Sequence, residues 1–168
     1  SCSLKIEYYG LKDYSDSIPR GINAIGFLIY KSIHNIFYEE RAIRQAVRAQ
    51  REDSGAVHAI GGGHGISDPT GSAAVRHATP LQSVTLATGR VIYKPESWLY
   101  VCDVCYGRMS EQEARILRLY YSRRMSPVEI MVKIGGYSKR AIYYLVHRFC
   151  SYGVELACQL GLVKVWED

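Results

Sequence analysis

The sequence predicts a mainly α-helical protein: an N-terminal amphipathic helix, a Gly-rich connector with a small β-hairpin, and a C-terminal three-helix domain. Three observations predict this fold class. Serine-capped helix starts precede amphipathic runs, a glycine pair separates two of these runs, and one segment rich in small residues divides the chain. With 168 residues, 48% of them hydrophobic, the chain can bury one core or two small ones.

The first region, residues 1–53, is expected to be helical from about Ile18 to Asp53, with Pro19 in its first turn. Isoleucines recur every seven residues along it, a spacing that keeps one stripe against a neighbouring helix. These isoleucines are Ile22, Ile29, Ile36 and Ile43. Two interpretations stay open: contact with a second copy of the chain in an oligomer, or packing of an amphipathic helix on its own domain.

A basic stripe lies at the far end of this helix. Its members are Arg41, Arg44, Arg48 and Arg51. Four acidic residues lie nearby, namely Glu39, Glu40, Glu52 and Asp53. An exposed face laced with salt bridges is therefore favoured over a phosphate-binding face.

The second region, residues 54–94, is rich in Gly, Ser and Thr, with a glycine cluster at residues 61–65. A phosphate-binding loop of the GxxxxGK type needs a lysine after its last glycine, but Ile66 follows Gly65. We therefore expect a flexible connector and not a nucleotide site. After it, the sequence predicts a short helix from Pro69 to about His77 and a β-hairpin of Ser83–Leu86 and Val91–Lys94.

The third region, residues 95–168, is expected to be helical to its end. Its first helix opens at Pro95 and has one apolar face, made of Trp98, Leu99, Cys102, Cys105 and Tyr106. The Cys102-x-x-Cys105 spacing also suits a metal, but zinc needs four ligands and no second such pair exists. We therefore expect these cysteines, like Cys150 and Cys158, to act as small buried hydrophobes, with no metal and no cofactor.

Three further helices have their own start signals. Ser110 and Glu113 form a capping box that opens a helix from Glu111 to about Tyr121. Ser126 starts a short helix, Pro127–Ile134, and Gly135-Gly136 stops it. Ser138 caps a helix beginning at Lys139, whose inward stripe is Ile142, Leu145, Val146 and Phe149.

A short helix, a tight glycine turn and a longer helix with a basic, aromatic outer face are typical of a helix-turn-helix, here at about residues 127–150. The stretch from Arg115 to Arg148 carries eight basic residues and one acid, Glu129. Such a local positive field attracts nucleic acid, while a solvated helical face is the plainer interpretation. The third region is therefore interpreted as a DNA-binding domain.

The residues expected to contact double-stranded DNA lie on the outer face of the second helix and just before the first. They are Arg123, Arg124, Ser138, Lys139, Arg140, Tyr143, Tyr144, His147 and Arg148. Lys139 and Arg140 suit guanine edges or phosphates, and the tyrosines suit hydrogen bonds or thymine methyl groups. The alternative for the tyrosines is packing against a neighbouring chain.

Residues 109–149, MSEQEARILRLYYSRRMSPVEIMVKIGGYSKRAIYYLVHRF, resemble region four of bacterial sigma factors and, more closely, the C-terminal part of RinA-like and ArpU-like phage transcriptional regulators. The matching features are Tyr120-Tyr121 at the end of the capped helix and the Tyr137-Ser138 step that starts the last one. The order of parts upstream is also similar, including Ile60-Gly61-Gly62. One departure is the glycine pair in the turn, where relatives more often have a single residue, and it affects the angle between the two helices.

The resemblance implies a phage or prophage regulator that activates late genes, acts in the bacterial cytoplasm and has no catalysis of its own. Double-stranded DNA is the expected partner, with bacterial RNA polymerase and a second copy of the chain as further candidates. The alternative function is a small terminase subunit, the DNA-recognition component of a phage packaging motor, which assembles as a ring.

Enzymatic and membrane functions are not expected. No paired carboxylates, Ser/His/Asp set or Cys/His set stands out. The longest apolar stretch, Ile22–Phe37, is too short and too polar for a bilayer. An odd number of cysteines, five, favours a reducing, intracellular setting.

Overall fold

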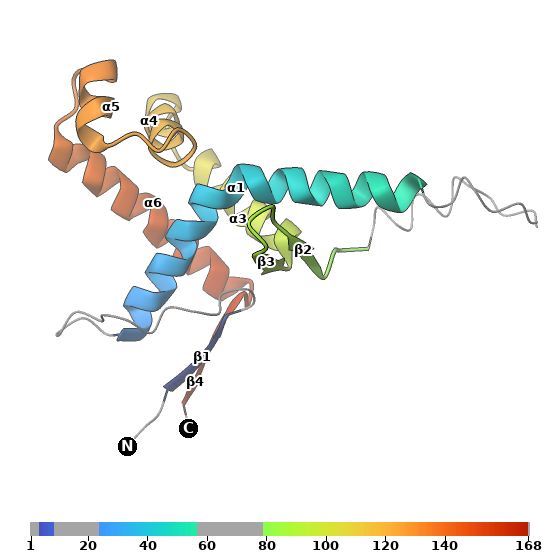
Figure 1. Ribbon diagram of the computed structural model, residues 1–168. Helices are drawn as coiled ribbons and strands as arrows, with labels where there is room; N and C mark the ends of the chain where they lie inside the picture. Colours follow the sequence, from blue (N-terminus) through green and yellow to red (C-terminus); the bar gives the residue numbers. More distant parts are fainter. Residues whose placement is uncertain (1–3, 9–23, 57–78, 168) are drawn as a thin grey trace, which may run out of the picture.

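The computed structural model describes residues 4–8, 24–56 and 79–167 of the chain (Figure 1). Within these ranges it is mainly helical, with five helices and two small antiparallel sheets. The elements, in chain order, are β1 (Leu4–Tyr8), α1 (Ala24–Ala56), β2 (Ser83–Thr85), β3 (Val91–Tyr93), α3 (Pro95–Gly107), α4 (Glu111–Tyr121), α5 (Pro127–Ile134), α6 (Lys139–Gln159) and β4 (Val163–Glu167). The mainly helical class that the sequence predicts is therefore confirmed.

Helix α1 is the longest element and changes direction near its middle, so that its first half lies beside α6 and its second half extends past α3 (Figure 1). The predicted N-terminal helix is confirmed from Ala24 onward and runs three residues beyond Asp53. Its predicted start, with Pro19 and Ile22, lies outside the described residues. The other isoleucines of the seven-residue repeat are buried inside the chain's own core: Ile29, Ile36 and Ile43. Of the two interpretations, packing on its own domain is thus the one observed for these side chains.

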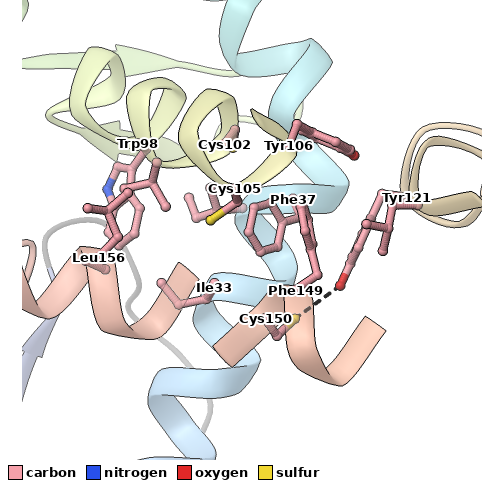
Figure 2. Packing of buried hydrophobic residues seen from close by; sticks show 14 of the residues in the cluster. Ile33, Phe37, Trp98, Cys102, Cys105, Tyr106, Tyr121, Phe149, Cys150 and Leu156 are labelled. Atoms are coloured by element: carbon pink, nitrogen blue, oxygen red, sulfur yellow. Dashed lines mark hydrogen bonds between the residues drawn. The ribbon is translucent and has the colours of Figure 1, made fainter. Parts of the chain in front are cut away.

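One hydrophobic core joins α1 to α3 and α6 (Figure 2). Phe37 of α1 meets Phe149 of α6 with ring centroids 4.2 Å apart, and Tyr106 of α3 meets the same Phe149 at 4.8 Å. The predicted apolar face of α3 is confirmed, because Trp98, Leu99, Cys102, Cys105 and Tyr106 are all buried. A helix from the first sequence region therefore shares its core with helices of the third.

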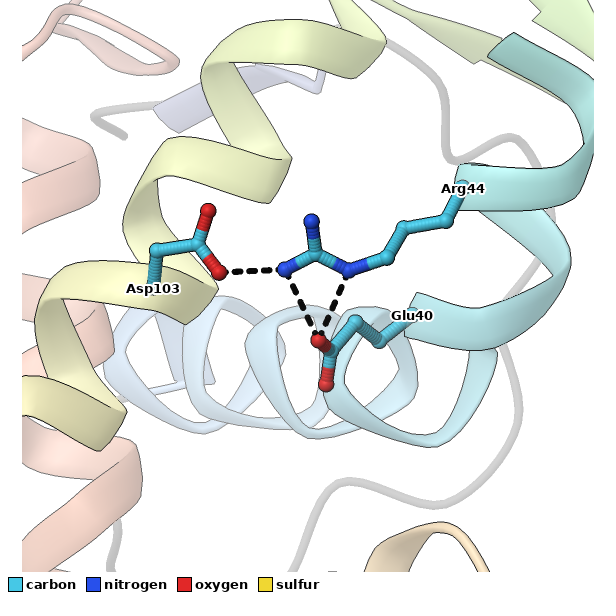
Figure 3. Close-up of polar contacts among 3 residues, drawn as sticks. All are labelled: Glu40, Arg44 and Asp103. Carbon is cyan, nitrogen blue, oxygen red and sulfur yellow. Dashed lines mark hydrogen bonds and ion pairs between the residues drawn. The ribbon is translucent and has the colours of Figure 1, made fainter. Parts of the chain in front are cut away.

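Ion pairs fix the outer edges of this core. The Arg44 guanidinium donates two hydrogen bonds to Glu40, at 3.1 and 3.0 Å, and also contacts Asp103 of α3 (Figure 3). Arg51 donates to Glu96, at the start of α3. The salt bridges predicted for the far end of α1 are present for Arg44 and Arg51, but only Arg44 pairs with an acid of its own helix. Both guanidinium groups also join α1 to α3, so these two arginines are half-buried and do not lie on a fully exposed face.

The predicted hairpin is also present, one residue shorter at the end of each strand. Val84 pairs with Ile92, and both are buried. Gly89 closes the turn with φ of +83°, a left-handed conformation that glycine adopts without steric cost, and its amide donates to Leu86 at 2.8 Å. Arg90 forms an ion pair with Glu39, which fastens the hairpin to α1. The glycine cluster and the short helix predicted before the hairpin lie outside the described residues.

Helices α4 and α5 have the bounds that their capping signals predict. In α4, Glu113 N donates to Ser110 Oγ at 3.2 Å, and Ser110 N donates to the Glu113 carboxylate at 3.0 Å. Ser126 and Glu129 form a second capping box at the start of α5, where the sequence had indicated only a serine followed by a proline. Two local side-chain contacts at each start thus define where these helices begin.

The end of the chain differs from the prediction. Helix α6 stops at Gln159, and residues Val163–Glu167 form β4, which pairs antiparallel with β1 in the register Tyr8↔Val163 to Leu4↔Glu167. Gly161, with φ of +65°, makes the turn between the helix and the strand. The expectation of helix to the end of the third region is therefore wrong. Residues Val163–Glu167 form a strand because they pair with β1 at the opposite end of the sequence, and local helical spacing cannot reveal such a distant partner.

Candidate nucleic-acid interface

Helices α4 and α5 pack against the first part of α6 at one end of the molecule (Figure 1). Gly135 and Gly136 both have positive φ, +70° and +74°, which turns the chain sharply after α5 without steric cost. Ser138 then caps α6, because its Oγ accepts a hydrogen bond from Ala141 N at 3.1 Å. Ile130 of α5 and Ile142 of α6 are fully buried and anchor the two helices. The start of α6 is thereby held firmly while its other face remains open.

The outward face of α6 carries most of the predicted site residues. Its exposed members are Lys139, Arg140, Tyr143, Tyr144 and His147. Tyr143 and Tyr144 are 49% and 66% exposed, although large aromatic side chains are usually well covered. The inward stripe predicted for this helix is confirmed, since Ile142, Leu145, Val146 and Phe149 are buried. The cationic, tyrosine-rich face is therefore not sealed against the protein's interior.

Most of the predicted cationic site residues form no ion pair with an acid in the part of the chain that the structure describes. Among the described residues, no carboxylate forms an ion pair with Lys139, Arg140, Arg123 or Arg124. Within residues 4–8, 24–56 and 79–167, the arginines that pair with acids are Arg44, Arg51, Arg90 and Arg148. Unpaired guanidinium and ammonium groups on an exposed surface suit the binding of a polyanion.

Arg148 differs from the other predicted site residues. Its guanidinium donates to the Glu113 carboxylate at 2.5 Å and is half-buried. Glu113 is also the capping residue of α4, so one carboxylate both caps that helix and holds α6. The hydrogen bond from the Ser110 amide is the largest cause that lowers the pKa of Glu113, and the ion pair with Arg148 lowers it further. The Arg148 guanidinium therefore pairs with an acid of the same chain. The spacing of residues along α6 did not predict this ion pair.

Sequence reasoning missed the tyrosines that α1 and α4 place beside the α6 face. Tyr30 of α1 lies against His147, with ring centroids 5.5 Å apart, and Tyr38 lies 5.9 Å from Tyr120. Arg124 has its Cζ 4.9 Å from the centroid of the Tyr38 ring. The Tyr-Tyr pair at the end of α4 was the one available signal, but residues of α1 are far away in sequence and no periodicity connects them.

A buried polar cluster lies beneath this surface. The Tyr121 hydroxyl is 3.1 Å from Cys150 Sγ (Figure 2). The same hydroxyl is 2.9 Å from His34 Nδ1, which is itself 3.4 Å from the sulfur. Burial raises the pKa of Cys150 to about 11, so the group is a thiol at neutral pH and a poor nucleophile. These contacts join α1, α4 and α6 and hold the three helices in register.

The cysteines follow the prediction only in part. Cys102, Cys105 and Cys150 are buried, and burial raises the pKa of Cys105 to about 12. Cys150 is nonetheless a hydrogen-bonding group, and Cys158 is exposed on the last turn of α6, so the expectation of a buried Cys158 is wrong. No set of three or more His, Cys, Asp or Glu side chains among the described residues is placed to hold a metal ion.

Comparisons with known proteins gave no counterpart. No family model, no curated protein and no solved structure matches the chain. Among the helices in the described ranges, none combines the length and low polarity needed to cross a bilayer. The function is therefore inferred from the chain's own side chains.

Proposed function

We propose that this chain is a sequence-specific double-stranded DNA-binding transcriptional regulator in which α5 and α6 act as a helix-turn-helix of the sigma-region-four type. The observation that carries the proposal is the exposed first half of α6, where unpaired cations and tyrosines share one face. A helix of this kind fits the major groove, where base edges present distinct patterns of donors and acceptors. A phage or prophage late-gene activator is the role that we propose for it.

The roles of individual side chains follow from their positions on α6. Lys139 and Arg140 stand at the start of the helix, where side chains reach furthest into a groove, and donate to guanine O6 and N7 or to phosphate oxygens. Tyr143 and Tyr144 lie one turn further along and offer both a hydroxyl and an apolar ring to thymine methyl groups. The ammonium of Lys139 lies 5.9 Å from the Tyr143 ring, so these two residues act as a pair.

The remaining predicted residues support this docking. Arg123 is exposed and precedes α5, a position suited to the phosphate backbone. Ser138 serves as the cap that fixes the direction of α6 and can still donate its hydroxyl hydrogen. In this role the protein acts in the bacterial cytoplasm without catalysis of its own, and RNA polymerase is the proposed second partner.

The test begins with selection of binding sites from a random duplex library, followed by fluorescence anisotropy on the selected duplex. Lys139→Ala/Arg140→Ala should weaken binding by about 1 to 3 kcal/mol for each base that the variant no longer reads, which is roughly 5- to 150-fold per base. The matched control is Arg41→Ala/Arg48→Ala, which removes two exposed charges from the second half of α1. Equal weakening in both variants would indicate non-specific attraction, and an unchanged affinity of a folded α6 variant would contradict the proposal.

Oligomeric state separates this proposal from the small terminase subunit. Ile29, Ile36 and Ile43 are used inside the core, so an assembly through α1 would need a different surface of that helix. Light scattering should give a monomer or a dimer for a promoter-binding regulator. A ring of about eight or more subunits would favour the packaging role instead.

A further inference from the structure

A second group of polar side chains lies beside the α6 face, where the end of α4 meets the middle of α1. It consists of Arg124, Tyr38 and Tyr120, which we name the Arg124 site. We propose that the Arg124 site binds the phosphate backbone of the DNA that flanks the groove occupied by α6. This inference rests on the proposed function and adds α1 to the DNA-binding surface.

The three side chains are in mutual contact. The Arg124 guanidinium covers the Tyr38 ring at 4.9 Å, and the Tyr38 and Tyr120 rings are 5.9 Å apart. Burial, and after it the neighbouring Tyr38 hydroxyl, raise the pKa of Tyr120 above its ordinary value. The Tyr120 hydroxyl therefore stays protonated at neutral pH and remains a hydrogen-bond donor.

The backbone at Arg124 is the second observation. Its φ is +54°, in the left-handed region that glycine enters freely and that a residue with a Cβ enters at a steric cost. The loop is held in place by Met125 N, which donates to Leu119 O at 3.1 Å. An arginine thus occupies a position whose geometry favours glycine, and that geometry directs its guanidinium over α1. Strained conformations of this kind concentrate at functional sites.

The chemistry of the site suits phosphate. A guanidinium that lies over an aromatic ring keeps its N–H edge free, and that edge matches the geometry of phosphate oxygens. Within the described ranges no carboxylate forms an ion pair with Arg124, which is exposed. Arginine and tyrosine are both frequent donors to the DNA backbone. The chemistry of the site therefore favours an anion as its occupant.

The position of the site identifies the anion as DNA phosphate. The Tyr120 ring centroid lies 6.0 Å from that of His34 in α1, and the same His34 ring lies 6.1 Å from that of Tyr30. On the same side, Tyr30 of α1 lies against His147 of α6, with ring centroids 5.5 Å apart. A continuous surface therefore runs from the α6 face to the Arg124 site, and a duplex seated on α6 has its backbone beside α1.

The test compares three variants at Arg124 and its tyrosines by anisotropy titrations over a range of salt concentrations. Arg124→Gly should keep the fold, because glycine suits the backbone conformation at this position. It should weaken binding to selected and unrelated duplexes alike, by on the order of tenfold. It should also lower the salt slope, which is the slope of log K against log salt concentration, by about one. Arg124→Lys should retain the salt slope because it keeps the charge. Tyr38→Phe/Tyr120→Phe should weaken binding without changing that slope, since it removes hydroxyls and no charge.

Three outcomes separate this inference from the proposed function. If Arg124→Gly binds like the wild type while Lys139→Ala/Arg140→Ala does not, the Arg124 site is excluded and the proposed function stands. If neither variant changes binding, the proposed function itself fails. If Arg124→Gly weakens binding no more than the exposed control Arg48→Ala, the effect is general charge attraction and the site is again excluded. Circular dichroism and thermal unfolding of Arg124→Gly should match or exceed the wild type and so confirm that its fold is intact.

Discussion

Gly153 of α6 lies directly against Ile33 of α1: a Cβ atom at Gly153 would fall 2.6 Å from Ile33 Cγ2 and 2.9 Å from Phe37 Cζ. Helices that approach this closely need a residue without a side chain at the crossing point. The crossing brings the first half of α1 beside α6, and it is this half that carries Tyr30, His34 and Tyr38. The contact therefore positions both the core and the proposed DNA-binding surface.

Replacement of Gly153 by alanine should destabilise the protein by about 1 to 3 kcal/mol, because the added methyl overlaps two buried side chains. The opposite sign would be expected from helix propensity alone, since alanine is favoured over glycine by about 1 kcal/mol inside a helix. Urea denaturation monitored by circular dichroism measures the difference.

Gly107→Ala is the matched control for this substitution. Gly107 is the last residue of α3, and an added Cβ there meets no atom within 4 Å. This variant should be neutral or slightly more stable. A Gly153→Ala protein as stable as Gly107→Ala would contradict the close packing of α1 on α6.

Protonation of His34 should couple stability to pH. Burial lowers its pKa below the ordinary value of 6.5, so the folded state binds fewer protons than the unfolded state near that pH. This stability is fully present above pH 6.5 and is lost as the pH falls toward the lowered value. Urea midpoints at pH 7.5 and 5.5 should therefore differ, and His34→Gln should reduce the difference.

The groups that face His34 belong to three helices and are phenols or a thiol: Tyr30, Tyr38, Tyr120, Tyr121 and Cys150. No carboxylate among the described residues forms an ion pair with His34. His147→Gln is the control, because that imidazole is exposed on α6. If His147→Gln flattened the pH dependence as much as His34→Gln, the buried cluster would not be its origin.

Protonation of Glu113 should cause a second loss of folding stability, at a lower pH than the loss caused by His34. The Ser110 amide and Arg148 hold its pKa below the ordinary value of 4.5. Its contribution to stability is complete above pH 4.5 and disappears as the pH falls through the lowered value. Glu113→Gln should cost about 1 to 2 kcal/mol at pH 7 and should flatten the acid limb of a plot of urea midpoint against pH.

The comparison for Glu113 is Glu111→Gln, in the first turn of the same helix. Glu111 is exposed, and its carboxylate interacts mainly with the helix dipole, so the destabilisation at pH 7 should be smaller, about 0.3 to 1 kcal/mol. Equal effects of both substitutions would show that the link between α4 and α6 through Arg148 contributes little.

Thiol accessibility provides a simple check of the fold. Cys158 is exposed, whereas Cys102 and Cys150 are fully buried. Under native conditions iodoacetamide should modify Cys158 much faster than these two, and unfolding in urea should remove the difference. Peptide mapping by mass spectrometry assigns each rate. Fast native labelling of Cys150 would contradict its position between Tyr121 and His34.

The sequence alone determined the local features of the third region. The start of α3 at Pro95 and the starts of α4, α5 and α6 depend on residues within four positions of one another, and the signals at Ser110, Ser126 and Ser138 are such contacts. The hairpin depends in the same way on a glycine turn. Apolar spacing likewise identified the buried face of each helix, because burial follows the helical period.

Tertiary structure decided which distant residues meet. Arg148 pairs with Glu113, Arg124 covers Tyr38, and β1 pairs with β4, and in each case the partners are far apart along the chain. Helical spacing places a side chain on a face but carries no information about what lies opposite it. Only the crossing of α1 over α6 at Gly153 brings the tyrosines of α1 and α4 beside the exposed cations of α6, because packing at that point fixes the distance between the two helices.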